Sequence, residues 1–329
     1  MTAPLSEATR QLELAARAAL HAPSVFNTQP WRWQITGDTM QLYADPSRQL
    51  PSTDPDGRLL LISCGAALHH ARTALAAAGW SASVERLPDP AQPDLLARVH
   101  LGRAVPAKPE AQRMAAAIER RRTDRRAFGR RAVSDTTLNR LRHFVEVERA
   151  YLHVVPEDQI PMLAISTERA ANAQHDDPAY REELDRWTSR PQWHGDGVPP
   201  STAVQPDLRR VPVRDFAPAG NAHMTAGRGA DEGAAYVIVF GTTDKRIDLL
   251  RGGEALSAML LQATAEGLAT AVASEAVEVT WPRHLLTTLL SDIGEPYIVV
   301  RLGYPVAHEM LPPQERRFPT ETIEIEHDG

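Results

Sequence analysis

Two segments of this chain repeat one pattern of small, apolar and polar residues 188 positions apart. Gly65 opens the stretch GAALHHARTALAAAG, and Gly253 opens GEALSAMLLQATAEG. Both stretches are apolar at helical spacing, and each ends at a glycine, Gly79 or Gly267, that suits the left-handed residue after a helix. Self-similarity of this kind indicates an internal repeat. We therefore expect two copies of one structural unit in a single chain.

The first copy surrounds its repeated helix with further predictable elements. An amphipathic pattern predicts a helix over 6–21. Two strands, 31–35 and 40–43, are joined at Gly37-Asp38, which is typical of a hairpin. A last apolar strand over 95–102 ends in Leu-Gly.

The second copy follows the same plan. Ser134 is placed to cap a helix, with Asp135 in the first turn. Strands are predicted at 151–155 and 235–241, and the copy ends in an apolar strand over 297–303 that again finishes with Leu-Gly.

The predicted fold class is therefore α+β, with two tandem half-repeats that form a single-chain pseudo-dimer of antiparallel-rich sheets flanked by helices. A chain of 329 residues is long enough for about two domains. We place the first repeat at 1–105, a connector at 106–117 and the second repeat at 118–329.

The segment 175–233 breaks this order. It is rich in proline and glycine, contains Trp187 and Trp193, and shows no sustained periodicity. A structureless loop of this length is uncommon in a compact domain and is usually a lid, a binding loop or a disordered segment. Because disordered linkers rarely contain tryptophan, a lid is the prediction and disorder is the alternative.

Neither the cysteine nor the histidines are placed to bind a metal. Cys64 is the only cysteine, which excludes an intrachain disulfide and a Cys-rich metal site, and its apolar neighbours favour burial. His69, His70, His194 and His223 lack partners at ligand spacing, so structural or surface roles are favoured. We predict no metal site.

Charge and hydropathy favour a soluble cytoplasmic protein. The net charge of −6 weakens the case for general nucleic-acid binding. The longest nearly apolar stretch, 59–68, falls well short of the roughly 20 residues of a membrane helix. Residues 1–13 lack the basic start and apolar run of a secretory leader. We expect binding to neither nucleic acid nor membrane.

The stretch APSVFNTQPWRW at 22–33 combines small polar groups with rigid residues. Ser24, Asn27, Thr28 and Gln29 can form hydrogen bonds, while the prolines and tryptophans keep the stretch from collapsing around a ligand. Such a mixture suits a flat polar heterocycle, although composition alone favours an ordinary helix-to-strand turn.

Two further stretches are rich in arginine. The block IERRRTDRRAF at 118–128 combines guanidinium groups with the hydroxyl of Thr123, which suits a phosphate monoester, and QERRFP at 314–319 offers two more arginines. Taken alone, each stretch is more typical of a solvated face, and the first is also compatible with docking of nucleic acid or an acidic protein. Apart from Phe128, the block lacks aromatic residues that would stack on bases.

Together these stretches resemble the nitroreductase superfamily of flavin proteins. The resemblance rests on APSxxNxQPWRW, RRTxRRxF, the helix end Gly267-Leu268 with its tail Ala273-Ser274-Glu275, the strand end LGYP at 302–305 and the terminal Arg-Arg. The usual members begin with RRSxR and reach APSxxNxQPW later. The permuted, duplicated order here resembles the Acg-like branch, in which one chain forms a pseudo-dimer with a long lid.

The resemblance implies FMN as the cofactor. In the family, the basic-hydroxyl block and a C-terminal arginine hold the phosphate, the proline-serine-asparagine loop lies along the isoalloxazine, and the tail after the glycine-capped helix passes the flavin N5. The implied cofactor-binding residues are Pro23, Ser24, Asn27, Gln29, Arg121, Arg122, Thr123, Arg125, Ala273, Ser274, Glu275, Arg316 and Arg317. Many family members have Glu-Gly where this chain has Ser274-Glu275. No side chain is implied as catalytic, because the flavin N5 carries the chemistry.

The implied activity is that of an NAD(P)H-dependent oxidoreductase, in which hydride passes to the flavin and then to a nitroaromatic or quinone acceptor. The alternative is an FMN-storage protein with a lid-covered flavin and little turnover. The implied partner is a small-molecule substrate or none. Ordinary members build each site across two chains, so we expect a monomer or loose homodimer in which the loop at Asn27 faces Arg121.

Overall fold

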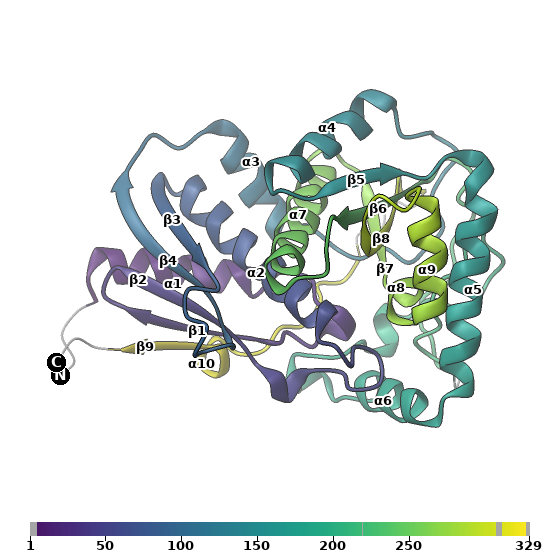
Figure 1. The fold of residues 1–329 in the computed structure, drawn as a ribbon, viewed down its shortest axis with the longest axis horizontal. Helices are drawn as coiled ribbons and strands as arrows, with labels where there is room; N and C mark the ends of the chain where they lie inside the picture. Colours follow the sequence, from purple (N-terminus) through teal and green to yellow (C-terminus); the bar gives the residue numbers. More distant parts are fainter. Residues whose placement is uncertain (1–4, 219, 307–310, 327–329) are drawn as a thin grey trace.

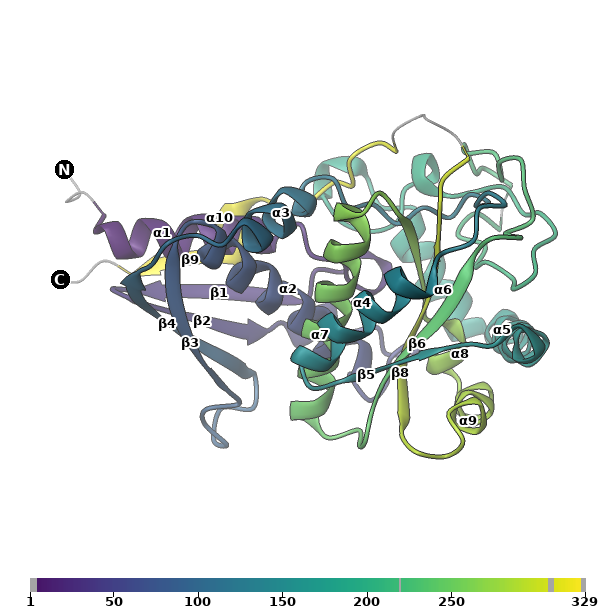
Figure 2. The same cartoon turned by 90° about the horizontal axis from the view of Figure 1, so that it is seen from above.

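The computed structural model describes residues 5–218, 220–306 and 311–326, and this part of the chain forms two sheets on either side of a pair of packed helices (Figures 1 and 2). The first sheet contains, in spatial order, β3 (Trp80–Arg86), β4 (Leu95–Ala104), β2 (Thr39–Ala44), β1 (Trp31–Thr36) and β9 (Ile323–Glu326). The second contains β5 (Tyr151–Val154), β6 (Ala235–Gly241), β8 (Glu295–Gly303) and β7 (Ala269–Ala273).

The two sheets have the same strand order. Strands β3-β4-β2-β1 in the first sheet correspond to β7-β8-β6-β5 in the second, and the neighbours within both sets are antiparallel. The α+β fold class with duplicated halves is thereby confirmed. The exact boundaries of the two repeats remain a proposal.

The helices of the two units also correspond. The first unit contains α1 (Glu7–Ala19) and α2 (Arg58–Ala77), and the second contains α4 (Asp135–Val147) and α7 (Arg246–Ala265). Ser6 caps α1 by accepting from the backbone N–H of Thr9, and Ser134 caps α4 by accepting from that of Thr137. The predicted serine cap of α4 is confirmed, because the side-chain oxygen satisfies a donor that the helix itself leaves free.

The central helices α2 and α7 cross at the two repeat glycines. A Cβ on Gly65 would lie 2.0 Å from the carbonyl oxygen of Leu250, and a Cβ on Gly253 would lie 2.0 Å from that of Ile62. Gly65 and Gly253 are 188 positions apart, and so are Ile62 and Leu250. The two contacts are therefore equivalent, and the crossing is close to two-fold symmetric. Of the described helices, α2 is long and apolar enough to cross a membrane, but 83% of that window is buried inside the protein.

The remaining helices surround this duplicated frame. They are α3 (Pro109–Ile118), α5 (Ile160–Asp176), α6 (Pro178–Thr188), α8 (Glu275–Glu278), α9 (Thr280–Leu289) and α10 (Pro319–Thr322). Short 3-10 turns lie at Val25–Asn27, Pro46–Arg48, Glu157–Gln159, Gln192–His194 and Pro200–Thr202. The C-terminal segment crosses back to the first unit, where β9 pairs in parallel with β1.

The segment 175–233 is not structureless, which corrects the prediction from its composition. Helix α6 forms within it, with Asp177 as the N-cap and Pro178 in the first turn. Tyr180, Leu184 and Trp187 of α6 pack against Phe26 and other buried residues. The insert is therefore a folded cover on the 22–33 loop, held by a hydrophobic cluster of its own.

Candidate functional site

The loop between α1 and β1 has an unusual backbone. Phe26, Asn27 and Gln29 have φ angles of 47°, 55° and 49°, in the left-handed region that non-glycine residues rarely adopt. The serine hydroxyls of the loop and of α2 stabilise this shape: Ser24 accepts from the backbone N–H of Gln29, and Ser63 accepts from that of Val25. Strain that is maintained in this way is characteristic of functional sites.

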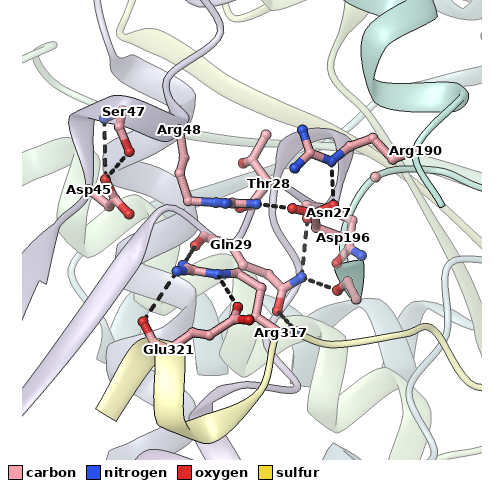
Figure 3. Close-up of polar contacts among 12 residues, drawn as sticks. Asn27, Thr28, Gln29, Asp45, Ser47, Arg48, Arg190, Asp196, Arg317 and Glu321 are labelled. Carbon is pink, nitrogen blue, oxygen red and sulfur yellow. Dashed lines mark hydrogen bonds and ion pairs between the residues drawn. The ribbon is translucent and has the colours of Figure 1, made fainter. Parts of the chain in front are cut away.

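Gln29 and Arg317 link the loop to the insert and to the C-terminal segment (Figure 3). The Gln29 side chain donates to the carbonyl of Gly195 at 2.7 Å and accepts from the backbone N–H of Arg317 at 3.0 Å. The Arg317 guanidinium donates to the carbonyls of Gln29, Trp31 and Glu321. Both residues were predicted to contact the cofactor; in this structure their side chains bond backbone groups, and neither lines the cavities described below.

The arginine block is attached to the edge of the second sheet. The backbone N–H of Asp124 donates to the carbonyl of Thr270 on β7 at 2.8 Å. From β8, the guanidinium of Arg301 donates to the carbonyls of Asp124 and Arg126 at 3.0 and 2.9 Å. The block therefore has a fixed backbone that presents Thr123 and Arg125 toward the first unit.

Loop and block form the walls of one cavity of about 70 Å³, which we call the arginine cavity. Its walls include most of the predicted set: Pro23, Ser24, Asn27, Arg121, Arg122, Thr123, Arg125 and Arg316. Arg316 donates to the Oδ1 of Asn27 at 2.9 Å, which links the C-terminal segment to the loop. The structure thus brings residues from three distant stretches of sequence to one place.

Among the described residues, the walls of the arginine cavity carry several guanidinium groups and no carboxylate. Arg121 is 4% exposed, and its Nε and Nη1 have no hydrogen-bond partner among the described residues; nor has Nε of Arg316. Burial, with Arg122 nearby, lowers the pKa of Arg121 to about 10. Burial and the neighbouring Arg121 lower that of Arg316 to about 9. A bound anion would satisfy these donors and remove the repulsion between the guanidinium groups.

A second cavity of about 80 Å³, the slot, adjoins the first. It shares Pro23, Ser24, Phe26, Thr123 and Arg125 with the arginine cavity. Its other walls are Val25, Leu59, Ile62, Ser63, Phe216, Leu256, Val272, Ser274 and Ile298. Apolar walls with a few hydroxyls are typical of a site for a planar ring system.

The predicted tail after β7 lies beside the slot. Ser274 lines the slot, whereas Ala273 and Glu275 line the next cavity along the edge of β7. The carboxylate of Glu275 lies 3.5 Å from the Nε of Arg214 in the insert. Glu275 therefore serves as a contact between the tail and the insert in this structure.

Sequence reasoning missed the residues that the insert brings to the site. Phe216 lies edge-on to Phe26, with ring centroids 5.6 Å apart, and the guanidinium of Arg125 lies 4.4 Å from its centroid. Arg214 is buried and pairs with Glu278 at 2.6 Å. The sequence run PVRDF at 212–216 contains this arginine and this phenylalanine. Nothing in the run itself indicates that it packs against the 22–33 loop.

Comparison with known proteins gives relatives along almost the whole chain, although no family model matches it. "Putative NAD(P)H nitroreductase acg" of Mycobacterium tuberculosis is 36% identical over 318 residues, which cover 96% of this chain and 95% of the relative. "Putative NAD(P)H nitroreductase Rv3131" of the same species is 38% identical over 314 residues, which cover 93% and 89%.

Solved structures of similar fold were also found. The FMN-dependent nitroreductase NfnB from Mycobacterium smegmatis, in complex with NADPH, matches 66% of this chain and 100% of its own at a TM-score of 0.43 and 16% identity. A nitroreductase with bound FMN from Desulfitobacterium hafniense matches 65% and 98% at a TM-score of 0.42 and 13% identity.

The chain combines a duplicated α+β frame with a cavity that the 22–33 loop and the arginine block form between its halves. Its relatives match it along nearly the whole chain. The chain therefore belongs to the nitroreductase superfamily. Within the superfamily it is similar to acg over nearly its whole length. The resemblance to the Acg-like branch, predicted from five short motifs, is confirmed.

Proposed function

We propose that this protein binds FMN and acts as an NAD(P)H-dependent oxidoreductase on nitroaromatic or quinone acceptors. The observation that carries the proposal is a set of unpaired guanidinium nitrogens in a cavity bounded by the Asn27 loop: Nε and Nη1 of the buried Arg121 and Nε of the half-buried Arg316 have no partner among the described residues. Such donors fit a phosphate monoester, which offers several acceptor oxygens and the charge that burial demands. The names of the relatives support a nicotinamide as the reductant.

Each cavity would hold a different part of the cofactor. Arg121, Arg316 and the hydroxyl of Thr123 would bind the phosphate, and the slot would receive the ring system. The slot measures about 80 Å³, and Phe216 of the insert forms part of its wall. Phe216 is therefore the side chain that would shift to make room for three fused rings.

Bound FMN would supply hydride transfer between nicotinamide and acceptor. The chain itself supplies position and charge. Arg125 lines both cavities, is half-buried, and would stabilise negative charge at the ring end of the site. The insert excludes water from the slot through the packing of Phe26 and Phe216.

The first test is the visible spectrum of the purified protein, which we expect to show the paired flavin bands and to release FMN on heating. The second is oxidation of NADPH or NADH by the FMN-loaded protein with nitrofurazone or menadione as acceptor. A colourless protein that does not take up added FMN would refute the proposal.

FMN storage is the second candidate, and the position of Phe216 over the slot favours it. If the insert stays closed over bound FMN, acceptors cannot approach the ring. FMN saturation with turnover near zero would then support storage over catalysis, while the same FMN saturation with steady turnover would support the oxidoreductase.

A further inference from the structure

A third cavity, of about 40 Å³, lies on the opposite face of the second sheet from the slot; we call it the inner cavity. Val299 and Arg301 of β8 line the inner cavity, whereas Ile298 lines the slot. Alternate residues of a strand point to opposite faces of its sheet, so the two cavities are separated by the sheet itself. They meet around β7, which is an edge strand, at Arg125 and Ser274.

The inner cavity is lined by residues with unused hydrogen-bond donors. Tyr236 is 2% exposed, and its hydroxyl has no partner among the described residues. The same is true of Nη1 of Arg214 and Nε of Arg301, both on side chains that are less than a tenth exposed. Buried polar groups are normally paired, so several unpaired donors around one cavity indicate a missing acceptor.

The acidic residues nearby are already engaged. Glu278 and Glu275 pair with Arg214, and Asp231 pairs with Arg301. Arg125 forms no ion pair among the described residues, and it donates one hydrogen bond, to the carbonyl of Thr202 at 3.3 Å. Its guanidinium is attracted by Glu275 and Asp124 but is paired with neither, so it can offset the repulsion that Glu275 would exert on an anion.

The size of the inner cavity limits what it can hold. At about 40 Å³ it is the smallest of the three cavities. A small planar group such as a carboxylate or nitrate suits a cavity of this kind better than an aromatic ring does. Because Arg125, Phe216, Val272 and Ser274 line both the inner cavity and the slot, a ligand whose head group lies in the inner cavity could reach the edge of a ring system held in the slot.

We propose that the inner cavity binds a planar oxyanion through the hydroxyl of Tyr236 and the guanidinium of Arg125, with the carboxylate of an aromatic acceptor as the intended ligand. The acceptor's body would then extend around the edge of β7 toward the slot. This role in acceptor recognition depends on the proposed function, whereas binding of an oxyanion in the cavity does not. The proposal makes carboxylated acceptors the preferred substrate class.

The test variant is Tyr236→Phe, and its control is Tyr180→Phe. Tyr180 is a similarly buried tyrosine that lines a different cavity, with Thr167 and Arg181, and not the inner cavity. Binding of benzoate and of nitrate is measured by isothermal titration calorimetry, with and without FMN. Loss of a hydrogen bond to a charged ligand should weaken binding about tenfold or more in Tyr236→Phe. The Tyr180→Phe variant should bind as the parent does.

Thermal unfolding of the ligand-free variants gives a second readout. Removing a buried hydroxyl that has no partner should leave the melting temperature of Tyr236→Phe unchanged or higher. A variant that is at least as stable and yet binds the anion more weakly cannot be explained by damage to the fold.

Two results would overturn the proposal: no binding of either anion to the parent, or equal affinity in the parent and Tyr236→Phe. Binding of nitrate without benzoate would support the cavity with a free inorganic ion as its ligand, and competition between the two would support the acceptor carboxylate. FMN uptake, followed by its visible bands in the same samples, reports on the proposed function separately.

Discussion

At the scale of single residues, the site depends on arginines that are buried before any anion is bound. Desolvation of a guanidinium costs free energy that a counter-ion normally offsets. Arg121 has no ion pair among the described residues, and its neighbours in the arginine cavity, Arg122 and Arg316, are also positive. The anion-free protein is therefore less stable than it would be without these unpaired charges, as expected of a preformed anion site.

Substitution of Arg121 should separate stability from binding. We expect Arg121→Met to leave the free energy of unfolding of the FMN-free protein unchanged or about 1 kcal/mol higher, because an unsatisfied buried charge is removed. FMN affinity should fall about a hundredfold, since two charge-assisted hydrogen bonds are lost. Urea unfolding and FMN fluorescence titration measure the two effects.

The matched control is Arg120→Met, one residue earlier, where the side chain is exposed and outside the arginine cavity. FMN affinity should be nearly unchanged in that variant. Equal losses of affinity in Arg121→Met and Arg120→Met would mean that general positive charge, and not a specific phosphate contact, attracts the cofactor.

Residue types predicted part of the site and not the rest. Arg121, Thr123 and Asn27 were recognisable because phosphate and flavin recognition calls for those groups, and the structure places them on one cavity. Gln29 and Arg317 belong to the same motifs, but their partners are backbone carbonyls at Gly195, Trp31 and elsewhere. Contacts of that kind depend on how distant loops pack, which the sequence does not display.

At the scale of elements, the crossing of α2 and α7 joins the two halves. Small residues at a helix crossing allow the backbones to approach, and here glycine meets glycine: a Cβ on Gly65 would lie 2.9 Å from the Cα of Gly253. The facing carbonyl of Leu250 is backbone and cannot move without moving its helix.

The substitution Gly65→Ala should therefore destabilise the protein, by about 3 kcal/mol or more in urea unfolding. Within a helix the same change normally stabilises by about 0.5–1 kcal/mol, so the sign itself tests the crossing. Gly129→Ala is the control, because a Cβ there meets only ordinary contacts at 3.5 Å. A stabilised Gly65→Ala protein would show that the helices cross less closely.

Among the elements that the sequence did not predict, α6 shows how composition can mislead. Tyr180, Leu184 and Trp187 recur at helical spacing after Asp177-Pro178, which is a regular start signal. The prolines and glycines around this short pattern suggested a loop. By contrast, α1, α2, α4 and α7 were predictable, because each has a long apolar periodicity and a recognisable cap or closing glycine.

At the scale of the whole molecule, the duplication creates two positions where a site could form, and one of them is closed. Arg86 lies 188 positions before Ser274 and is therefore its counterpart in the other repeat. The counterpart of the Asn27 loop, which joins α1 to β1, is the short turn between α4 and β5, and Glu148 lies in that turn. There Arg72 donates to Glu148 and Glu254 at 2.7 and 2.6 Å, and Arg86 also pairs with the fully buried Glu254. An ion-pair network fills the position, with its charges already matched.

We therefore expect one FMN per chain, and we expect damage to the single site to weaken all of the specific FMN binding. Fluorescence titration of the FMN-free protein should reach its end point at one equivalent of FMN per chain. Sedimentation gives the molecular mass of the same sample. Because Arg121 belongs to the open site alone, Arg121→Met should weaken all of the binding and not half of it. An end point near two equivalents, or a variant that keeps half of its sites at full affinity, would show that the counterpart position also binds the cofactor and that the ion pairs of Glu254 open to admit it.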